Sequence, residues 1–135
     1  MPATRLWHHR LFHILDSIAA IRSRISGVSR EEFRMNTEKV DGIERRLQVI
    51  SEAVRFVPEH ERSRFPLVPW RQVADFGNVS RHEYDAVDPE RLWNVATGEL
   101  AALEAACTTL YLEHRRPTDP APPGLALQLG EESEE

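Results

Sequence analysis

Apolar residues recur at steps of three and four over two long stretches of the chain, and this spacing predicts two long amphipathic helices. The first stretch contains Trp7, Leu11, Ile14, Ile18, Ile21 and Ile25. The second contains Val40, Ile43, Leu47, Ile50, Val54 and Val57. Gly27 and Pro58 follow them as stop signals. The polar face of the second stretch, with Asp41, Glu44, Arg45, Arg46 and Glu52, is typical of a solvated surface, or lines a groove if the protein dimerises.

Short segments with cap and turn signals surround these stretches. Ser29 and Glu32 have the spacing of a capping box, which predicts a short helix through Phe33. Asn36 or Thr37 is suited to cap the second long helix. The segment 58–69 contains three prolines and predicts at most a turn or short helix, anchored by Phe65 and Leu67.

Two further helical patterns complete the domain. Pro69 suits a first helical turn, and Trp70, Val73 and Phe76 follow it, with Gly77 expected to weaken or kink the helix. Asp88 before Pro89 is a second start signal. The last apolar series consists of Leu92, Val95, Ala96, Leu100, Leu103, Cys107 and Leu110. Because no strand-like alternation occurs, the predicted fold is all-α, a small antiparallel helical bundle.

Composition divides the chain at residue 116. Residues 1–116 fit one helical domain, whereas residues 117–135 are rich in Pro, Gly, Ala and Glu, which predicts a disordered tail. The net charge is −5, but five of the 22 acidic residues lie after Arg116, so the rest carries 17 residues of each sign. Nucleic acid would therefore contact a local groove and not a uniformly basic face.

The expected compartment follows from cysteine usage and the N-terminal residues. Cys107 is the single cysteine, and its place in the last apolar series predicts a buried thiol. Charged and histidine residues interrupt the first apolar stretch, which argues against a signal peptide or membrane span. A cytoplasmic protein without membrane contact is the expectation.

A polar cluster stands between the third and the last helical patterns: Asn78, Ser80, Arg81, His82, Glu83 and Tyr84. Histidine can exchange a proton near neutral pH, and arginine can bind phosphate. On one helix Asn78 lies a turn before His82, but Tyr84 points elsewhere unless the helix breaks after His82. The alternative is that the cluster only caps a helix and turns into Asp88.

The remaining histidines favour roles other than metal binding. His9 and His13 have the i, i+4 spacing of a metal pair, yet no carboxylate or cysteine nearby completes a ligand set. A surface or interface role is predicted for these two and for His8. His60 falls in a charged linker and His114 at a helix end. Neither a metal nor a cofactor is predicted.

The motif segment resembles the HepT-like branch of the HEPN families. The shared residues are Val68-Pro-Trp-Arg71, Asn78, His82-Glu-Tyr84 and Val87-Asp-Pro-Glu-Arg-Leu-Trp93. Upstream, residues 5–15, Glu31-Glu-Phe33, Asp41 to Arg45, Leu47, Ile50 and Glu52-Ala53 match in the same order. The resemblance extends from about residue 5 to about residue 112 and excludes the tail.

The resemblance implies a HEPN-type bundle that forms a homodimer about a two-fold axis. It also implies a metal-independent RNase toxin, encoded with a minimal nucleotidyltransferase antitoxin that attaches AMP to a tyrosine. The family's histidine corresponds to His82, its asparagine to Asn78 and the modified tyrosine to Tyr84. RNA is then the substrate, and the shared groove of the dimer is the active site.

One residue of the family motif is missing. An arginine separated from the histidine by four to six intervening residues would fall at Asp75, Phe76 or Gly77. Arg81 and Arg71 are the nearest arginines on the same segment, and Arg81 joins Asn78 and His82 as a predicted site residue. Two hypotheses follow: an endoribonuclease that uses His82, or a degenerate helical module that binds the nucleotidyltransferase or a nucleotide.

Overall fold

The computed structural model describes residues 7–82 and 88–123, and for residues 77–82 it describes only the helical backbone. The helices are α2 (His8–Ile25), α3 (Arg30–Arg34), α4 (Thr37–Val54), α5 (Glu59–Arg62), α6 (Trp70–His82), α7 (Pro89–Gly98) and α8 (Ala101–His114). No strand occurs among the described residues. The predicted all-α bundle is therefore confirmed.

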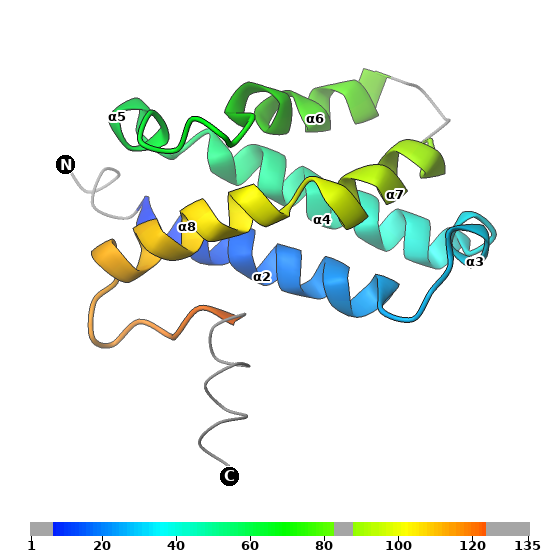
Figure 1. Ribbon diagram of the computed structural model, residues 1–135, viewed down its shortest axis with the longest axis horizontal. Helices are drawn as coiled ribbons and strands as arrows, with labels where there is room; N and C mark the ends of the chain where they lie inside the picture. Colours follow the sequence, from blue (N-terminus) through cyan, green and yellow to red (C-terminus); the bar gives the residue numbers. More distant parts are fainter. Residues whose placement is uncertain (1–6, 83–87, 124–135) are drawn as a thin grey trace, which may run out of the picture.

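The core lies between α2, α4 and α8, with α6 against the far side of α4. Figure 1 shows α2 and α4 side by side, α8 running along α2, and α6 above α4. Both predicted apolar series face inward: Ile14, Ile18 and Ile21 of α2 and Ile43 of α4 are fully buried. Burial of these two faces supplies the main driving force for the bundle.

The predicted cap signals form as expected. The Ser29 hydroxyl accepts a bond from the Glu32 amide, and the Glu32 carboxylate accepts one from the Ser29 amide, so the capping box is complete. Asn36, not Thr37, caps α4 by accepting a bond from the Lys39 amide. Gly27 turns the chain between α2 and α3 with a φ of 74°, a value that glycine adopts without steric cost.

The linker before α6 is anchored differently from the prediction. Phe65 is half-buried as expected, but Leu67 is 88% exposed, so its assignment as an anchor was wrong. Val68 and Trp70 are buried instead. The indole N–H of Trp70 donates to the carbonyl oxygens of Arg62 and Phe65, each at 3.1 Å, which ties the linker to the start of α6.

The structure bears on two expectations about helix breaks. Gly77 was expected to weaken or kink its helix, and α6 continues past it to His82, because a single glycine costs a helix only about 1 kcal/mol. The last apolar series is divided between α7 and α8. Glu99 ends α7 with a ψ near 2°, and Leu100, buried, precedes α8, so both helices keep their apolar side on the core.

Residues 117–123 also differ from the disordered tail that composition predicted. Asp119 and Pro122 are buried, and the Tyr111 hydroxyl donates a bond of 2.7 Å to the Pro120 carbonyl oxygen. Polar contacts to the bundle, which composition cannot reveal, fix this short segment. Residues 124–135 of the predicted tail lie outside the described residues.

Candidate functional site

The predicted site residues share the second half of α6. Asn78, Arg81 and His82 all lie within this helix, and His82 is the last residue before the segment 83–87 that the structure does not describe. With 3.6 residues per turn, positions 71, 75, 78 and 82 fall along one side of the helix. Arg71 and Asp75 on this side are exposed, so the side faces away from the core. Tyr84, the predicted modification site, lies outside the described residues.

Helix α4 holds α6 one turn before Asn78. The hydroxyl of Ser51 and the guanidinium of Arg55 both donate to the carbonyl oxygen of Ala74, at 2.8 Å and 2.7 Å. Ser51 is buried, whereas Arg55 is exposed at the C-terminal end of α4. The two bonds fix the axial position of α6 against α4 and place an arginine at the edge of the motif helix.

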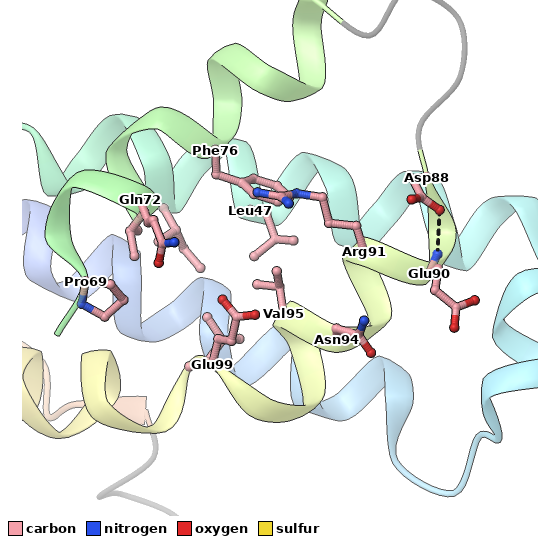
Figure 2. A pocket seen from close by; sticks show the side chains of 13 residues that line it. Leu47, Pro69, Gln72, Phe76, Asp88, Glu90, Arg91, Asn94, Val95 and Glu99 are labelled. Atoms are coloured by element: carbon pink, nitrogen blue, oxygen red, sulfur yellow. Dashed lines mark hydrogen bonds between the residues drawn. The ribbon is translucent and has the colours of Figure 1, made fainter. Parts of the chain in front are cut away.

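The positions where the family motif has its arginine carry no cation on the described side chains. Asp75 is exposed and acidic. Phe76 is buried, and the Arg91 guanidinium of α7 lies 5.6 Å from the centre of its ring (Figure 2). Phe76 is thus a core residue that joins α6 to α7 and is not a substitute ligand for phosphate.

A cavity of about 340 Å³ lies between α4, α6 and α7. Figure 2 shows its polar rim, to which Gln72, Arg91, Asn94 and Glu99 contribute, above an apolar floor that includes Leu47. Positions 76 and 78 of α6 are about 160° apart around the helix axis. The cavity therefore lies on the opposite side of α6 from Asn78.

A histidine pair joins the start of α2 to the segment after α8. The Nε2 atom of His8 lies 3.0 Å from Oδ2 of Asp119, and Nε2 of His9 lies 3.8 Å from Oδ1. The Arg116 backbone amide donates a hydrogen bond of 2.8 Å to the Asp119 carboxylate. This bond holds the pKa of Asp119 well below its usual range. Burial raises that pKa, and the contact with His8 lowers it further. His8 is buried, so of its two predicted roles, surface or interface, the surface role was wrong.

The donor atoms of His8, His9 and Asp119 are close enough together to share a metal ion. The Arg116 guanidinium, however, lies 3.3 Å from Nε2 of His9 and 3.5 Å from Oδ1 of Asp119. Because a cation already faces these two atoms, the cluster is better described as a hydrogen-bonded clasp than as a set of metal ligands.

A second cluster ties α5 to the end of α8. Arg64 contacts Glu61 at 2.7 Å and Glu113 at 2.8 Å, and Nε2 of His114 lies 3.0 Å from the Glu61 carboxylate. Hydrogen bonds from Arg64 lower the pKa of both carboxyl groups. Glu61, Glu113 and His114 also have metal-ligand spacing, but the Arg64 guanidinium already binds both carboxylates. The network stabilises the end of the bundle that is remote from His82.

Sequence patterns did not reveal Arg55, Asp119 or the partner of His114. Arg55 follows an apolar series as one more polar residue, and Asp119 belongs to a segment of disordered composition. In the sequence, Arg55 and Asp119 are recognisable only as charged residues near the end of a helix. Such residues are common on solvated surfaces and do not by themselves indicate a contact.

The sequence was then compared with known proteins. A sequence model of the family described as Ribonuclease HepT-like matches residues 14–110. This chain belongs to the HepT-like ribonuclease family. A protein of Caldanaerobacter subterraneus subsp. tengcongensis, named as a candidate RNase, is 31% identical over 94 residues, covering 70% of this chain and 84% of the relative. One of Thermococcus cleftensis, named as a candidate HepT ribonuclease, is 25% identical over 91 residues, covering 67% and 83%.

The relatives support the HepT-like assignment over most of the described bundle. A candidate RNase of Methanocaldococcus jannaschii is 27% identical over 94 residues, covering 70% of this chain and 86% of that relative. No solved structure matches the chain. None of the described helices of this HepT-like protein has the length and apolar character needed to cross a membrane.

Proposed function

We propose that this HepT-like protein is a metal-independent endoribonuclease and the toxin of a toxin–antitoxin pair. The observation that carries the proposal is the position of the motif. A family model of ribonucleases matches residues 14–110, and within that match α6 includes positions 78 and 82, which helical spacing puts on the same side as the exposed Arg71 and Asp75.

The chemistry requires a base, an acid and a cation. His82 removes the proton of a ribose 2′-hydroxyl, and the 2′-oxygen attacks the adjacent phosphorus. The bond from phosphorus to the 5′-oxygen breaks, the leaving oxygen takes a proton, and the products are a 2′,3′-cyclic phosphate and a 5′-hydroxyl. Asn78, one turn earlier, donates a hydrogen bond to the phosphate. Arg81 is the arginine nearest to His82 in the sequence.

One histidine cannot be base and acid in the same step, so a second copy is needed at the site. A homodimer with His82 of each protomer near the two-fold axis supplies both groups in one groove. The exposed side of α6, with Arg71 and Asp75, and the polar face of α4 are the surfaces available for such pairing. The dimer therefore completes the active site.

The proposed antitoxin is a minimal nucleotidyltransferase that transfers AMP to Tyr84. The phenol oxygen attacks the α-phosphorus of ATP, the bond to the β-phosphate bridging oxygen breaks, and pyrophosphate leaves. A phenol has a pKa near 10, so the partner must supply the base. An AMP group two residues from His82 adds negative charge and bulk, which repels RNA phosphate and closes the groove.

A second candidate function rests on the missing motif arginine. Asp75 is acidic and Phe76 is buried, and Gly77 has no side chain to bind phosphate. Loss of that cation costs about 3 kcal/mol of transition-state stabilisation, or about a hundredfold in rate. A degenerate module would retain only its binding to the nucleotidyltransferase or to a nucleotide.

Cleavage of single-stranded RNA by purified protein in the presence of a chelator decides between the two functions. The endoribonuclease is expected to produce cyclic phosphate ends, and His82→Ala is expected to abolish cleavage without loss of helical content. His13→Ala is the matched control, because His13 is an exposed histidine of α2. Equal cleavage by the wild type and by His82→Ala would refute the proposal, and an inactive wild type would favour the degenerate module.

A further inference from the structure

The guanidinium of Arg55 lies beside α6 at the level where the family motif has its arginine. In an α-helix the carbonyl of residue 74 points toward the amide of residue 78, so its oxygen lies between the levels of these two residues. Arg55 donates to that oxygen at 2.7 Å. The residues between 74 and 78 include 75–77, the positions at which the family motif would have its arginine and this chain has none.

The same contact places Arg55 on the side of α6 that leads to the motif. Asn78 follows Ala74 by four residues, so it lies about 40° from Ala74 around the helix axis and about 6 Å along it. His82 follows Ala74 by eight residues, which gives about 80° and about 12 Å. A ribonucleotide phosphate bound in front of Asn78 would lie within this span. The cavity between α6 and α7 is on the other side of the helix and does not compete for it.

Arg55 keeps most of its donors available for an anion. A guanidinium has five N–H donors, and the contact with Ala74 involves one nitrogen. Among the described residues, no carboxylate neutralises Arg55, whereas Arg64 is held by both Glu61 and Glu113. Arg55 is also exposed, so a phosphate reaches it without displacing core residues.

Ser51 explains how this arrangement stays in place. Its hydroxyl donates to the same carbonyl oxygen at 2.8 Å from a buried position one turn earlier on α4. The contact between α4 and α6 therefore does not depend on Arg55 alone. An exposed arginine whose anchoring role is shared with a buried serine is available for a second function.

We infer that Arg55 forms a phosphate-binding subsite next to α6, on the side that leads to Asn78, and supplies, from α4, the cation that α6 lacks. The inference rests on the proposed function, because it assigns the ligand as the backbone phosphate of RNA. Arginine suits this ligand because its planar fork binds two phosphate oxygens at once. Each protomer contributes one such subsite, so the groove of the proposed dimer contains two.

The test separates phosphate binding from helix packing with four variants. Arg55→Gln removes the cation and leaves a shorter, neutral polar side chain. Ser51→Ala removes the other bond to Ala74 and retains the cation. Arg45→Gln, at another exposed arginine of α4, is the control for net charge. The double variant Arg55→Gln with Gly77→Arg restores a cation, now from α6. If Arg55→Gln does not fold, Arg55→Met, which keeps the aliphatic stem, takes its place.

Two readouts are measured on each variant. Affinity for a 2′-O-methyl RNA oligonucleotide, which cannot be cleaved, is followed against salt concentration, where each lost phosphate contact lowers the slope by about 0.7. Cleavage of unmodified RNA is measured alongside, with an expected loss of about a hundredfold for Arg55→Gln. Arg45→Gln is expected to retain both the slope and the rate. Ser51→Ala keeps the cation and is expected to retain the salt slope, so a loss of rate in this variant reports the packing of α6 against α4. The double variant is expected to regain both.

The outcomes distinguish this inference from the proposed function. An unchanged salt slope in Arg55→Gln, or an equal loss in Ser51→Ala, would overturn the subsite even if the wild type cleaves RNA. A slope that depends on Arg55 in a protein that does not cleave RNA would uphold the subsite and refute the nuclease. A wild type that neither binds nor cleaves RNA would overturn both.

Discussion

The imidazole of His8 and the carboxylate of Asp119, 111 residues apart in the sequence, lie 3.0 Å apart in the fold. This contact joins the first turn of α2 to the segment that follows α8. It closes the chain on itself, so the bundle is fastened at the end opposite to α3.

Asp119 should make stability depend on pH at the acidic end. The Arg116 amide, with help from His8, lowers the pKa of Asp119 in the folded state. The stabilisation is therefore fully present above the pKa of an unfolded aspartate, about 3.9, and is lost as the pH falls toward the lower pKa of the folded state. Asp119→Asn should lower the melting temperature at neutral pH, and the two curves should converge in acid.

Asp41→Asn is the control for this prediction, because Asp41 is exposed on α4. Melting temperatures measured from pH 7 downward by circular dichroism provide the comparison. A constant difference between wild type and Asp119→Asn at every pH would contradict the role given to the Asp119 charge. Glu61 and Glu113 titrate in both proteins and cancel in the difference.

Leu110→Ala should destabilise the bundle by about 2–5 kcal/mol, because it leaves a cavity in a packed core. Leu110 is fully buried on α8. Leu112 on the same helix is 45% exposed, so Leu112→Ala should have a much smaller effect. Urea unfolding of both variants gives the free energies. Equal losses would mean that the inward face of α8 has been misassigned.

The proposed dimer predicts a mass of twice 15.5 kDa in solution at micromolar concentration. Light scattering coupled to size exclusion measures it. If the outward side of α6 forms the interface, Arg71→Glu should weaken the dimer, because the changed charge adds to that of Asp75 one turn later. A stable monomer would contradict the composite active site.

Gly77→Arg should raise the rate of RNA cleavage by about a hundredfold if no other residue replaces the missing phosphate-binding cation. If Arg55 replaces it, the gain should appear only in the Arg55→Gln background. The substitution also favours the helix, since arginine has a higher helix propensity than glycine. Gly77→Ala is the matched control, because it improves helix propensity without adding charge. An equal gain in both variants would assign the effect to helix stability and not to phosphate binding.

Tyr84 should gain mass in steps of one AMP when the protein is co-expressed with a cognate nucleotidyltransferase. Intact-mass measurement detects these adducts, and Tyr84→Phe should remove them. The other tyrosine, Tyr111, is buried and bonded to Pro120, so it should remain unmodified. An unmodified Tyr84 beside an active partner enzyme would refute this part of the proposal.

Local features of the fold could be predicted from sequence because they depend on residues within one or two helical turns. The Ser29 capping box, the Asn36 cap and the Asp88 cap each involve a side chain and a backbone amide two or three residues away. The buried faces of α2 and α4 followed from spacing in the same way. The motif at the end of α6 also came from the order of residues, through its family resemblance.

The tertiary structure decided which polar residues meet across the bundle. Arg55 and Ala74 are brought together by the contact of α4 with α6, and His8 and Asp119 by the return of the chain after α8. Such pairs have no fixed spacing in a sequence, because they depend on how the helices pack and where the connections end. For the same reason Leu67 was misplaced in the core: one residue in an irregular linker turns a side chain outward, and Val68 takes its place.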